Sequence, residues 1–277
     1  MILLFSPSIL CYRFSRCFLL SKFKNFNTST MSSLENIFNG WNDVNQRILK
    51  ATENKEQKFL KPRLVAVSKT KPIEQIIYIY HKGQRHFGEN YVQELLTKAN
   101  DPELLEKCPD IKWHFIGLVQ TNKISKILSV PNLELIETIH SQKLADALNA
   151  VWKSQNNNCL LKIMVQVNTS LEEEKNGVLP NNTVNLCKHI KNNCENLKLI
   201  GLMTIGRFGY DCSLGPNPDF LALVECKKKV CMELNLDLNE FELSMGMSDD
   251  FEHAIECGST NVRVGSSIFG YRPKKEK

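Results

Sequence analysis

Apolar residues along this chain follow two spacings that alternate from about residue 34 to residue 272. Short apolar runs are typical of buried strands, and segments with apolar residues every three or four positions are typical of helices. Eight strand-like runs lie within 64–67, 84–90, 113–117, 133–139, 160–167, 197–205, 241–244 and 261–264. Because helical segments separate consecutive strands, the pattern predicts an α/β fold, a single (β/α)8 TIM-type barrel.

One further helix is expected before the first strand, over 34–55. Its apolar residues are Ile37, Trp41, Val44 and Ile48, which share one helical face. We expect this N-terminal helix to close the bottom of the barrel.

Helix ends and loops can also be predicted. Thr121 and Ser141 precede helical segments and are typical N-caps, and Gly258 is typical of a helix C-terminus. The longest irregular segment, 206–218, contains three glycines and two prolines. A loop of this length and composition indicates a flap beside a functional site.

Residues 1–33 have a different composition from the rest. No acidic residue precedes Glu35, and the opening apolar run is too short to span a bilayer and lacks a preceding positive region. The composition is typical of a mitochondrial transit peptide. The alternative is an upstream start codon, with Met31 as the working initiator. We therefore expect the barrel domain to occupy 34–277, and the protein to be cytoplasmic, mitochondrial or both.

The distribution of charge along the chain argues against a nucleic-acid partner. The 277 residues carry 35 Lys and Arg against 30 Asp and Glu, a net charge of +5. Four basic residues of the leader account for most of this excess: Arg13, Arg16, Lys22 and Lys24. Without them 31 basic residues face 30 acidic ones, and no basic stripe with interleaved aromatics appears.

The ten cysteines do not form a metal or disulfide pattern. They are scattered without a Cys-x-x-Cys pair, and the six histidines are equally dispersed. Such a distribution indicates reduced thiols that behave as small buried hydrophobic residues. The sequence therefore predicts no metal.

Candidate chemistry begins at Lys69, two residues after the apolar run 64–67 and three residues before Pro72. Pro72 ends the strand and suits the first turn of a helix, so Lys69 lies at the carboxyl end of a buried parallel strand. This is the edge at which α/β barrels place their active sites. The lysine is either a solvated strand-end residue or a desolvated amine for Schiff-base chemistry.

Two further strand ends are suited to holding a phosphate. Segments 244–248 and 265–267 are rich in Gly and Ser and join the seventh and eighth strands to the following helices, where backbone N–H groups are free. We expect 246–248 to cap a helix over 249–257. Arg263 has the parity to point into the barrel, where it meets either a core carboxylate or a ligand atom.

Six segments, in this order, resemble those of the pyridoxal-phosphate homeostasis protein family. They are 67–70 (VSKT), 86–90 (HFGEN), 113–117 (WHFIG), 201–204 (GLMT), 243–255 (LSMGMSDDFEHAI) and 262–270 (VRVGSSIFG). The family is similar to the N-terminal barrel domain of alanine racemase and carries pyridoxal 5′-phosphate (PLP). The basic leader and Arg207, where a small residue is expected, depart from the family pattern.

The resemblance implies roles for individual residues. Lys69 would form a Schiff base with PLP, Arg263 would face the pyridine nitrogen, and Asn90 would lie beside the ring. Ser244, Gly265 and Ser266 would hold the phosphate. The implied function is to hold, buffer or deliver PLP and so maintain vitamin B6 homeostasis, without enzymatic turnover.

The alternative is a PLP-dependent racemase or lyase that acts on amino acids. The expected partners are PLP and apo forms of PLP-dependent enzymes, with no nucleic acid and no membrane. We expect a monomer.

Overall fold

The computed structural model describes residues 28–53, 61–155, 158–172, 174–207 and 209–271. Contacts divide the chain into two units, Met1–Asn36 and Ile37–Lys277, and the barrel belongs to the second. Most of the predicted leader lies outside the described residues, so its role stays a prediction. Among the helices of the described ranges, none combines the length and the apolar character needed to cross a membrane.

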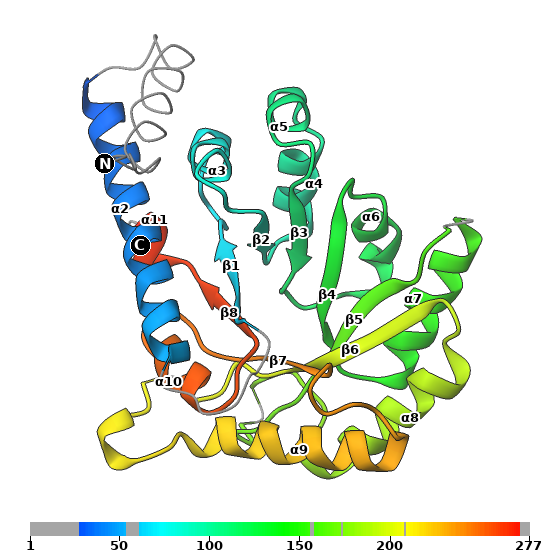
Figure 1. Cartoon of the computed structure of the whole chain (residues 1–277). Coiled ribbons are helices and arrows are strands. Elements are labelled where there is room, and N and C mark those ends of the chain that lie inside the picture. Colours follow the sequence, from blue (N-terminus) through cyan, green and yellow to red (C-terminus); the bar gives the residue numbers. More distant parts are fainter. Residues whose placement is uncertain (1–27, 54–60, 156–157, 173, 208, 272–277) are drawn as a thin grey trace, which may run out of the picture. The chain divides into compact units, whose positions relative to one another are not determined.

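Eight parallel strands close into a barrel in chain order (Figure 1). They are β1 Arg63–Val67, β2 His86–Glu89, β3 Lys112–Phe115, β4 Leu133–Ile139, β5 Leu161–Gln166, β6 Leu197–Met203, β7 Glu242–Ser244 and β8 Asn261–Val264. Pairing of β1 with β8, with Val65 opposite Arg263, completes the ring. The predicted barrel is confirmed, and each predicted strand overlaps an observed one.

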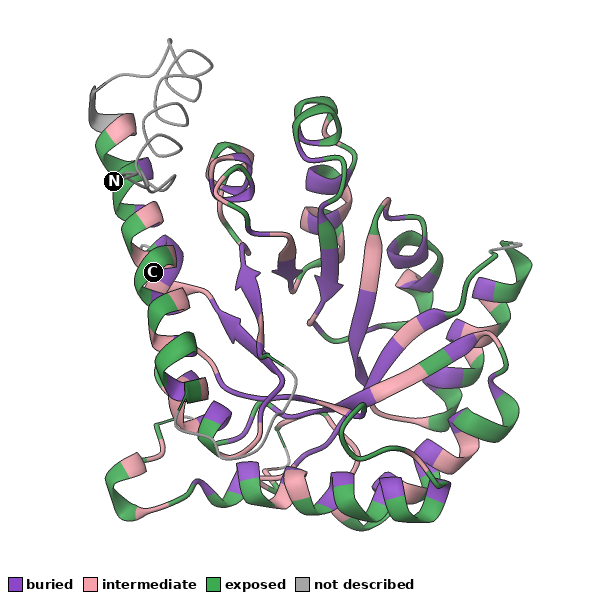
Figure 2. Ribbon diagram, viewed as in Figure 1, coloured by how far each residue is buried: buried purple, intermediate pink, exposed green. Residues whose placement is uncertain are grey.

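A helix precedes the first strand, and helices follow each strand on the outside of the barrel. They are α2 Thr28–Glu53, α3 Ile73–Tyr80, α4 Val92–Ala99, α5 Pro102–Lys107, α6 Ile124–Leu128, α7 Gln142–Ser154, α8 Thr183–Asn193, α9 Pro218–Leu234, α10 Phe251–Glu256 and α11 Ser266–Phe269. Short 3-10 turns occur at η1 Thr121–Lys123, η2 Pro180–Asn182 and η3 Cys212–Leu214. The strands and the inward helix faces are the buried parts of the barrel (Figure 2).

The N-terminal helix differs from its prediction in position. The amphipathic pattern is confirmed, since Ile37, Val44 and Ile48 are buried. However, Arg47 of α2 pairs with Glu252 of α10, and the part of α2 from Ile37 onward runs beside α10 and α11 on the barrel wall (Figure 1). Its prediction as a cover for the barrel bottom is therefore wrong.

Two of the predicted helix ends are confirmed and two are wrong. The Ser141 hydroxyl accepts a hydrogen bond from the Leu144 N–H at 3.3 Å, and Gly258 follows Cys257, the C-cap of α10, with a φ of +112°. Thr121 is instead the first residue of η1 and caps no helix. The N-cap of α10 is Asp250 and not Ser248, because the Ser248 hydroxyl faces the N–H of Gly265.

Candidate functional site

A cavity of about 520 Å³ opens at the carboxyl ends of the strands. Five of the six predicted site residues line it: Lys69, Asn90, Arg263, Gly265 and Ser266. Its walls also include apolar side chains, namely Val67, Ile116, Met203, Ile205 and Met247. A pocket with apolar walls and a few convergent polar groups is the usual form of a small-molecule site.

Lys69 lies two residues beyond β1 in a tight turn. It is half-buried, and the next residue, Thr70, has a φ of +65°. A threonine in this left-handed region is strained by about 1–2 kcal/mol, because its Cβ crowds the backbone. Lys71 also lines the cavity, and its Nζ donates to the backbone oxygen of Phe269 at 2.7 Å. The turn thus places two amines near the cavity.

Arg263 enters the cavity from β8 and is held firmly on its other side. Its Nη1 donates to the Ser244 hydroxyl at 2.6 Å and its Nη2 donates to the backbone oxygen of Thr204 at 2.7 Å. The side chain is only 5% exposed, and this burial lowers the pKa of Arg263 below its ordinary value. A guanidinium remains charged in proteins, so the cavity contains a fixed cationic donor.

Ser244, the sixth predicted residue, is fully buried and does not line the cavity. Its hydroxyl donates to Glu137 Oε2 at 2.5 Å and accepts hydrogen bonds from Arg263 and from Asn261 Nδ2, the latter at 2.9 Å. The structure therefore brings Ser244 to the guanidinium of Arg263 and not to the cavity.

A chain of buried polar groups continues from Ser244 across the barrel. Glu137 Oε1 accepts from His114 Nδ1 at 2.7 Å, and His114 Nε2 lies 2.9 Å from His86 Nδ1. Burial alone would raise the pKa of Glu137, but the hydrogen bond and charge of His114, the charge of Arg263 and the Ser244 hydrogen bond together lower it. Glu137 is therefore the buried counter-charge of Arg263.

Sequence reasoning missed this network. Glu137 is the fully buried one of two acidic residues in the mostly apolar strand β4, and His114 lies between two buried aromatic residues of β3, Trp113 and Phe115. A charged or polar residue in an otherwise apolar buried strand is the signal that could have revealed them. The partners of Glu137 belong to β3, β7 and β8, and His114 also contacts His86 of β2, so only the closed barrel shows that these residues meet.

The loop after β8 lines the cavity with Gly265 and Ser266. The Gly265 N–H points to the Ser248 hydroxyl at 3.2 Å, and both residues line the cavity together with Ser266. A Cβ on Gly265 would lie 3.3 Å from the backbone oxygen of Val67, so even a small side chain would crowd the end of β1. Backbone N–H groups without bulky neighbours form a suitable cradle for an anion.

Asn90 supplies an unsatisfied polar atom. Its side-chain Oδ1 is buried and has no hydrogen-bond partner within the described part of the chain. The backbone here is also tightly packed, because a Cβ on Gly117 would lie 1.9 Å from the backbone oxygen of Asn90. A buried acceptor without a partner costs stability, and its position in the cavity wall suits a ligand that donates a hydrogen bond or carries an ordered water.

Other residues at the cavity were not predicted as site residues. They are Lys71, Met247, Ser248, Asp249, Gly270 and Tyr271. Tyr210, in the predicted flap, does not line the cavity, and neither does Arg207. The Arg207 N–H instead donates to Asp219 at 2.6 Å, which ties the described start of this loop to α9.

Known proteins resemble this chain over most of its length. A family model described as "Alanine racemase, N-terminal domain" matches residues 45–273. The pyridoxal phosphate homeostasis protein of Homo sapiens is 52% identical over 236 residues, which cover 84% of this chain and 86% of that protein. The protein of the same name from Haemophilus influenzae is 40% identical over 241 residues, 86% of this chain and 96% of that protein. The chain belongs to the pyridoxal phosphate homeostasis protein family.

Solved structures of other proteins are also similar to this chain. PipY from Synechococcus elongatus, solved without PLP and with PLP bound, superposes with TM-scores of 0.68 and 0.64 at 29% and 28% identity. Both cover 81% of this chain and 99% of their own. Alanine racemase from Corynebacterium glutamicum, with a TM-score of 0.59 and 14% identity over 88% of this chain and 62% of its own, shares the fold alone. The family resemblance inferred from the motifs is confirmed.

A second cavity of this protein, of about 400 Å³, lies at the opposite end of the barrel. Four of its charged side chains form two ion pairs. Arg63 Nη1 contacts Glu242 at 2.7 Å and Lys162 Nζ contacts Glu134 at 2.5 Å. These two pairs leave their four charges neutralised by one another, and we place no ligand at this end of the barrel.

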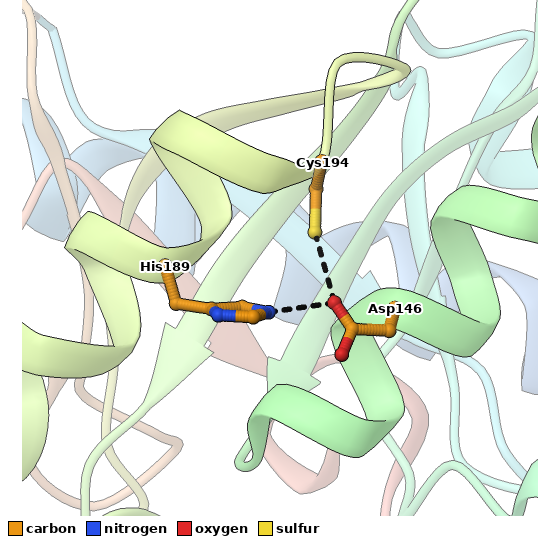
Figure 3. Close-up of side chains that lie close together, drawn as sticks. All are labelled: Asp146, His189 and Cys194. Carbon is orange, nitrogen blue, oxygen red and sulfur yellow. Dashed lines mark hydrogen bonds and ion pairs between the residues drawn. The ribbon is translucent and has the colours of Figure 1, made fainter.

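One cluster of potential metal ligands lies away from both cavities, within the described ranges (Figure 3). Asp146 of α7 accepts from His189 Nε2 of α8 at 2.6 Å, and the Cys194 thiol lies 3.6 Å from the same oxygen. Asn193 Nδ2 contacts His189 Nδ1, which leaves the proton of a neutral imidazole on Nε2, and burial raises the pKa of Cys194 to about 11. With protons on His189 Nε2 and on the Cys194 thiol, the cluster is a hydrogen-bonded contact between two helices.

Proposed function

We propose that this protein binds PLP covalently through Lys69, as a Schiff base, and holds, buffers or delivers the cofactor within the cell. One observation carries the proposal. A lysine, a fixed guanidinium and the Gly/Ser loop after β8 open onto the same cavity, in a member of a family named for PLP homeostasis. The PLP-bound structure of PipY, a relative with the same fold, supports it.

Five residues of the cavity suit particular parts of PLP. Bound PLP supplies an aldehyde that an amine captures reversibly, and Lys69 provides that amine. Gly265 and Ser266 would hold the phosphate with backbone N–H groups. Arg263 would donate to the pyridine nitrogen, and Asn90, with its unsatisfied Oδ1, would lie beside the ring.

Ser244 takes a different role in this proposal from the one expected from the sequence. Its buried hydroxyl connects Arg263 to Glu137, so it would position the guanidinium and not touch the phosphate. Ser248, whose hydroxyl already faces the Gly265 and Ser267 N–H groups, is the serine better placed near the phosphate.

The test of the covalent link is reduction with borohydride followed by peptide mass analysis. We expect the pyridoxyl group on Lys69 in the wild type and none on Lys69→Ala. Lys71→Ala is the matched control, because Lys71 lines the same cavity and should not be needed for labelling. A label on Lys71 in the wild type, or a Lys69→Ala protein that still becomes labelled, would overturn the assignment.

Storage and delivery are the second part of the proposal. We expect a monomer that passes PLP to apo forms of PLP-dependent enzymes. The test incubates PLP-loaded protein with such an apo-enzyme, either mixed or separated by a dialysis membrane. Faster activation in the mixture than across the membrane would support direct delivery, and equal rates would reduce the role to buffering.

A PLP-dependent racemase or lyase is the other candidate function. The observation that favours it is the presence of Tyr271 and Asp249 in the cavity wall, since each is a group that can exchange a proton. Against it stands Arg263, which offers only donors to the ring nitrogen and cannot support a protonated pyridine.

A further inference from the structure

The turn that presents Lys69 is held from the neighbouring helix on both sides. Before Lys69, the backbone oxygen of Ser68 accepts a hydrogen bond from Lys98 Nζ at 2.7 Å. After Lys69, the N–H of the strained residue Thr70 donates to the carboxylate of Glu94. Lys98 and Glu94 belong to α4, so one helix contacts the peptide groups on either side of the lysine.

The two contacting residues form an ion pair with each other. Lys98 Nζ lies 2.7 Å from Glu94 Oε1, one helical turn away, and 2.8 Å from Glu89 Oε1 at the end of β2. Glu89 in turn accepts from the Ser68 hydroxyl at 2.7 Å. Every charged group of this cluster therefore contacts either the turn itself or the lysine that holds it.

Burial makes this pair different from ordinary helix ion pairs. The Lys98 side chain is 7% exposed and Glu89 is fully buried, whereas in the pair Lys107–Glu103 of α5 both side chains are more than 40% exposed. An exposed pair of this spacing contributes only about 0.3–0.5 kcal/mol. Removing two charges from water costs several kcal/mol, so a buried pair is weak evidence for stability and requires another explanation.

A strained backbone at a functional site supplies that explanation. A non-glycine residue with positive φ persists only where the surrounding contacts determine its conformation. The turn is closed by the hydrogen bond from the Lys71 N–H to the backbone oxygen of Ser68 at 3.0 Å. The side-chain contacts that reinforce it are the Glu94 carboxylate on the Thr70 N–H and the Lys98 ammonium on the same Ser68 oxygen.

We propose that Lys98 and Glu94 are positioning residues that hold the Lys69 turn in its left-handed geometry and thereby direct the Lys69 amine into the cavity. The inference rests on the proposed function of Lys69. It assigns no contact between the pair and the cofactor. The pair acts through the two peptide groups that flank the lysine.

The principal variant is Glu94→Ala in the full chain. Glu94 is 22% exposed, so its removal should leave the fold intact while it frees the Thr70 N–H. We expect amide hydrogen exchange at Thr70 in the PLP-free protein to become at least tenfold faster, and PLP release from the loaded protein to become about tenfold faster. Glu94→Gln, which keeps an acceptor oxygen but loses the charge, should give intermediate values.

The matched control is Glu103→Ala, which breaks the exposed pair of α5 and should change neither rate. Lys98→Met leaves Glu89 without its counter-charge, so it is studied together with Glu89→Gln to preserve folding. This double variant should also accelerate PLP release.

Two results would overturn the positioning role. One is unchanged exchange at Thr70 in Glu94→Ala, and the other is faster exchange with PLP release as slow as in the wild type. Because exchange is measured without PLP, it still decides the geometric part if wild-type Lys69 proves not to bind PLP. A wild-type Lys69 that does not bind PLP would count against the proposed function and not against the positioning role.

Discussion

At the residue scale, Gly265 combines the absence of a side chain with a position at the start of α11. An added Cβ would already lie 3.4 Å from the Val67 Cβ, so a valine would fill the space in front of the backbone N–H groups. We expect Gly265→Val to lose most PLP after gel filtration, whereas Ser266→Ala should retain it, because the backbone N–H and not the hydroxyl holds the phosphate. Absorbance of the filtered protein measures the bound fraction. PLP retention by Gly265→Val equal to that of the wild type would contradict the placement.

His86 ends the buried polar network and gives it a pH dependence. Burial, followed by the charge of His114, lowers the pKa of His86 to about 2. The unfolded imidazole takes up a proton near pH 6.5 but the folded one does not, so stability present above pH 6.5 is lost as the pH falls. From pH 7 to pH 5 this group alone should cost up to about 2 kcal/mol of the free energy of unfolding.

The variant His86→Asn should therefore lose less stability over this range than the wild type does. Asparagine can still form a hydrogen bond with His114 Nε2, through its amide nitrogen or its amide oxygen, but does not titrate. Urea denaturation at pH 7 and pH 5 measures the difference, with the exposed His81→Asn as control. An equal loss of stability in wild type and His86→Asn would show that the folded imidazole takes up a proton normally.

Residues differ in how well their roles follow from sequence. Lys69 and Gly265 lie at strand ends, so the strand pattern alone predicts that they reach the carboxyl edge of the barrel. Ser244 also ends a strand, but its side chain points into the core and meets Glu137 of β4. Strand position predicts the edge, whereas the partner of a buried hydroxyl depends on the closed barrel.

At the element scale, α2 packs against α11 through Gly40. An ideal Cβ at Gly40 would lie 2.4 Å from the backbone oxygen of Ser267, so the two helices approach too closely for any side chain. We expect Gly40→Ala to destabilise the protein by about 1–3 kcal/mol through overpacking, although alanine favours helix by about 1 kcal/mol. PLP retention should also fall, because α11 begins at the cavity.

Chemical denaturation measures this cost. Asn39→Ala is the matched control, since Asn39 is an exposed neighbour in the same helix. Unfolding of Gly40→Ala at the same denaturant concentration as the wild type would mean that α2 can shift without cost.

Elements follow from sequence where local periodicity determines them. The eight strands and the long helices have strong apolar patterns and were predicted. The short helix α5 was missed, although Asp101 accepts from the Glu103 and Leu104 N–H groups and Pro102 follows it, which together are a recognisable helix start. Ser248 was misassigned as a cap because its hydroxyl has a tertiary partner, which local pattern does not reveal.

At the scale of the whole molecule, the barrel separates two regions of charge. The cavity at the carboxyl ends contains Lys69, Lys71 and Arg263, with one carboxylate in its wall, Asp249. The buried network of Glu137 lies between this cavity and the paired charges at the other end of the barrel. A cavity with this excess of cationic groups suits retention of an anionic cofactor.

The same arrangement predicts that the PLP-loaded protein turns amino acids over poorly or not at all. A PLP enzyme that forms a carbanion usually relies on a protonated pyridine as electron sink, which a carboxylate normally holds. Arg263 is fixed by Ser244 and Thr204 and offers only donors, so the nitrogen beside it would stay unprotonated. Incubation with L-alanine and L-serine, followed by chiral analysis, should show no racemisation above that of free PLP.

Turnover of about one per second or faster would instead place the protein among PLP enzymes. A second base would then be required, and Tyr271 is the tyrosine in the cavity wall of the described chain. Tyr210 is the matched comparison, since it lies in the loop after β6 and does not line the cavity. Loss of turnover in Tyr271→Phe but not in Tyr210→Phe would identify that base, whereas absence of turnover in the wild type would leave both tyrosines without a catalytic role and support cofactor storage.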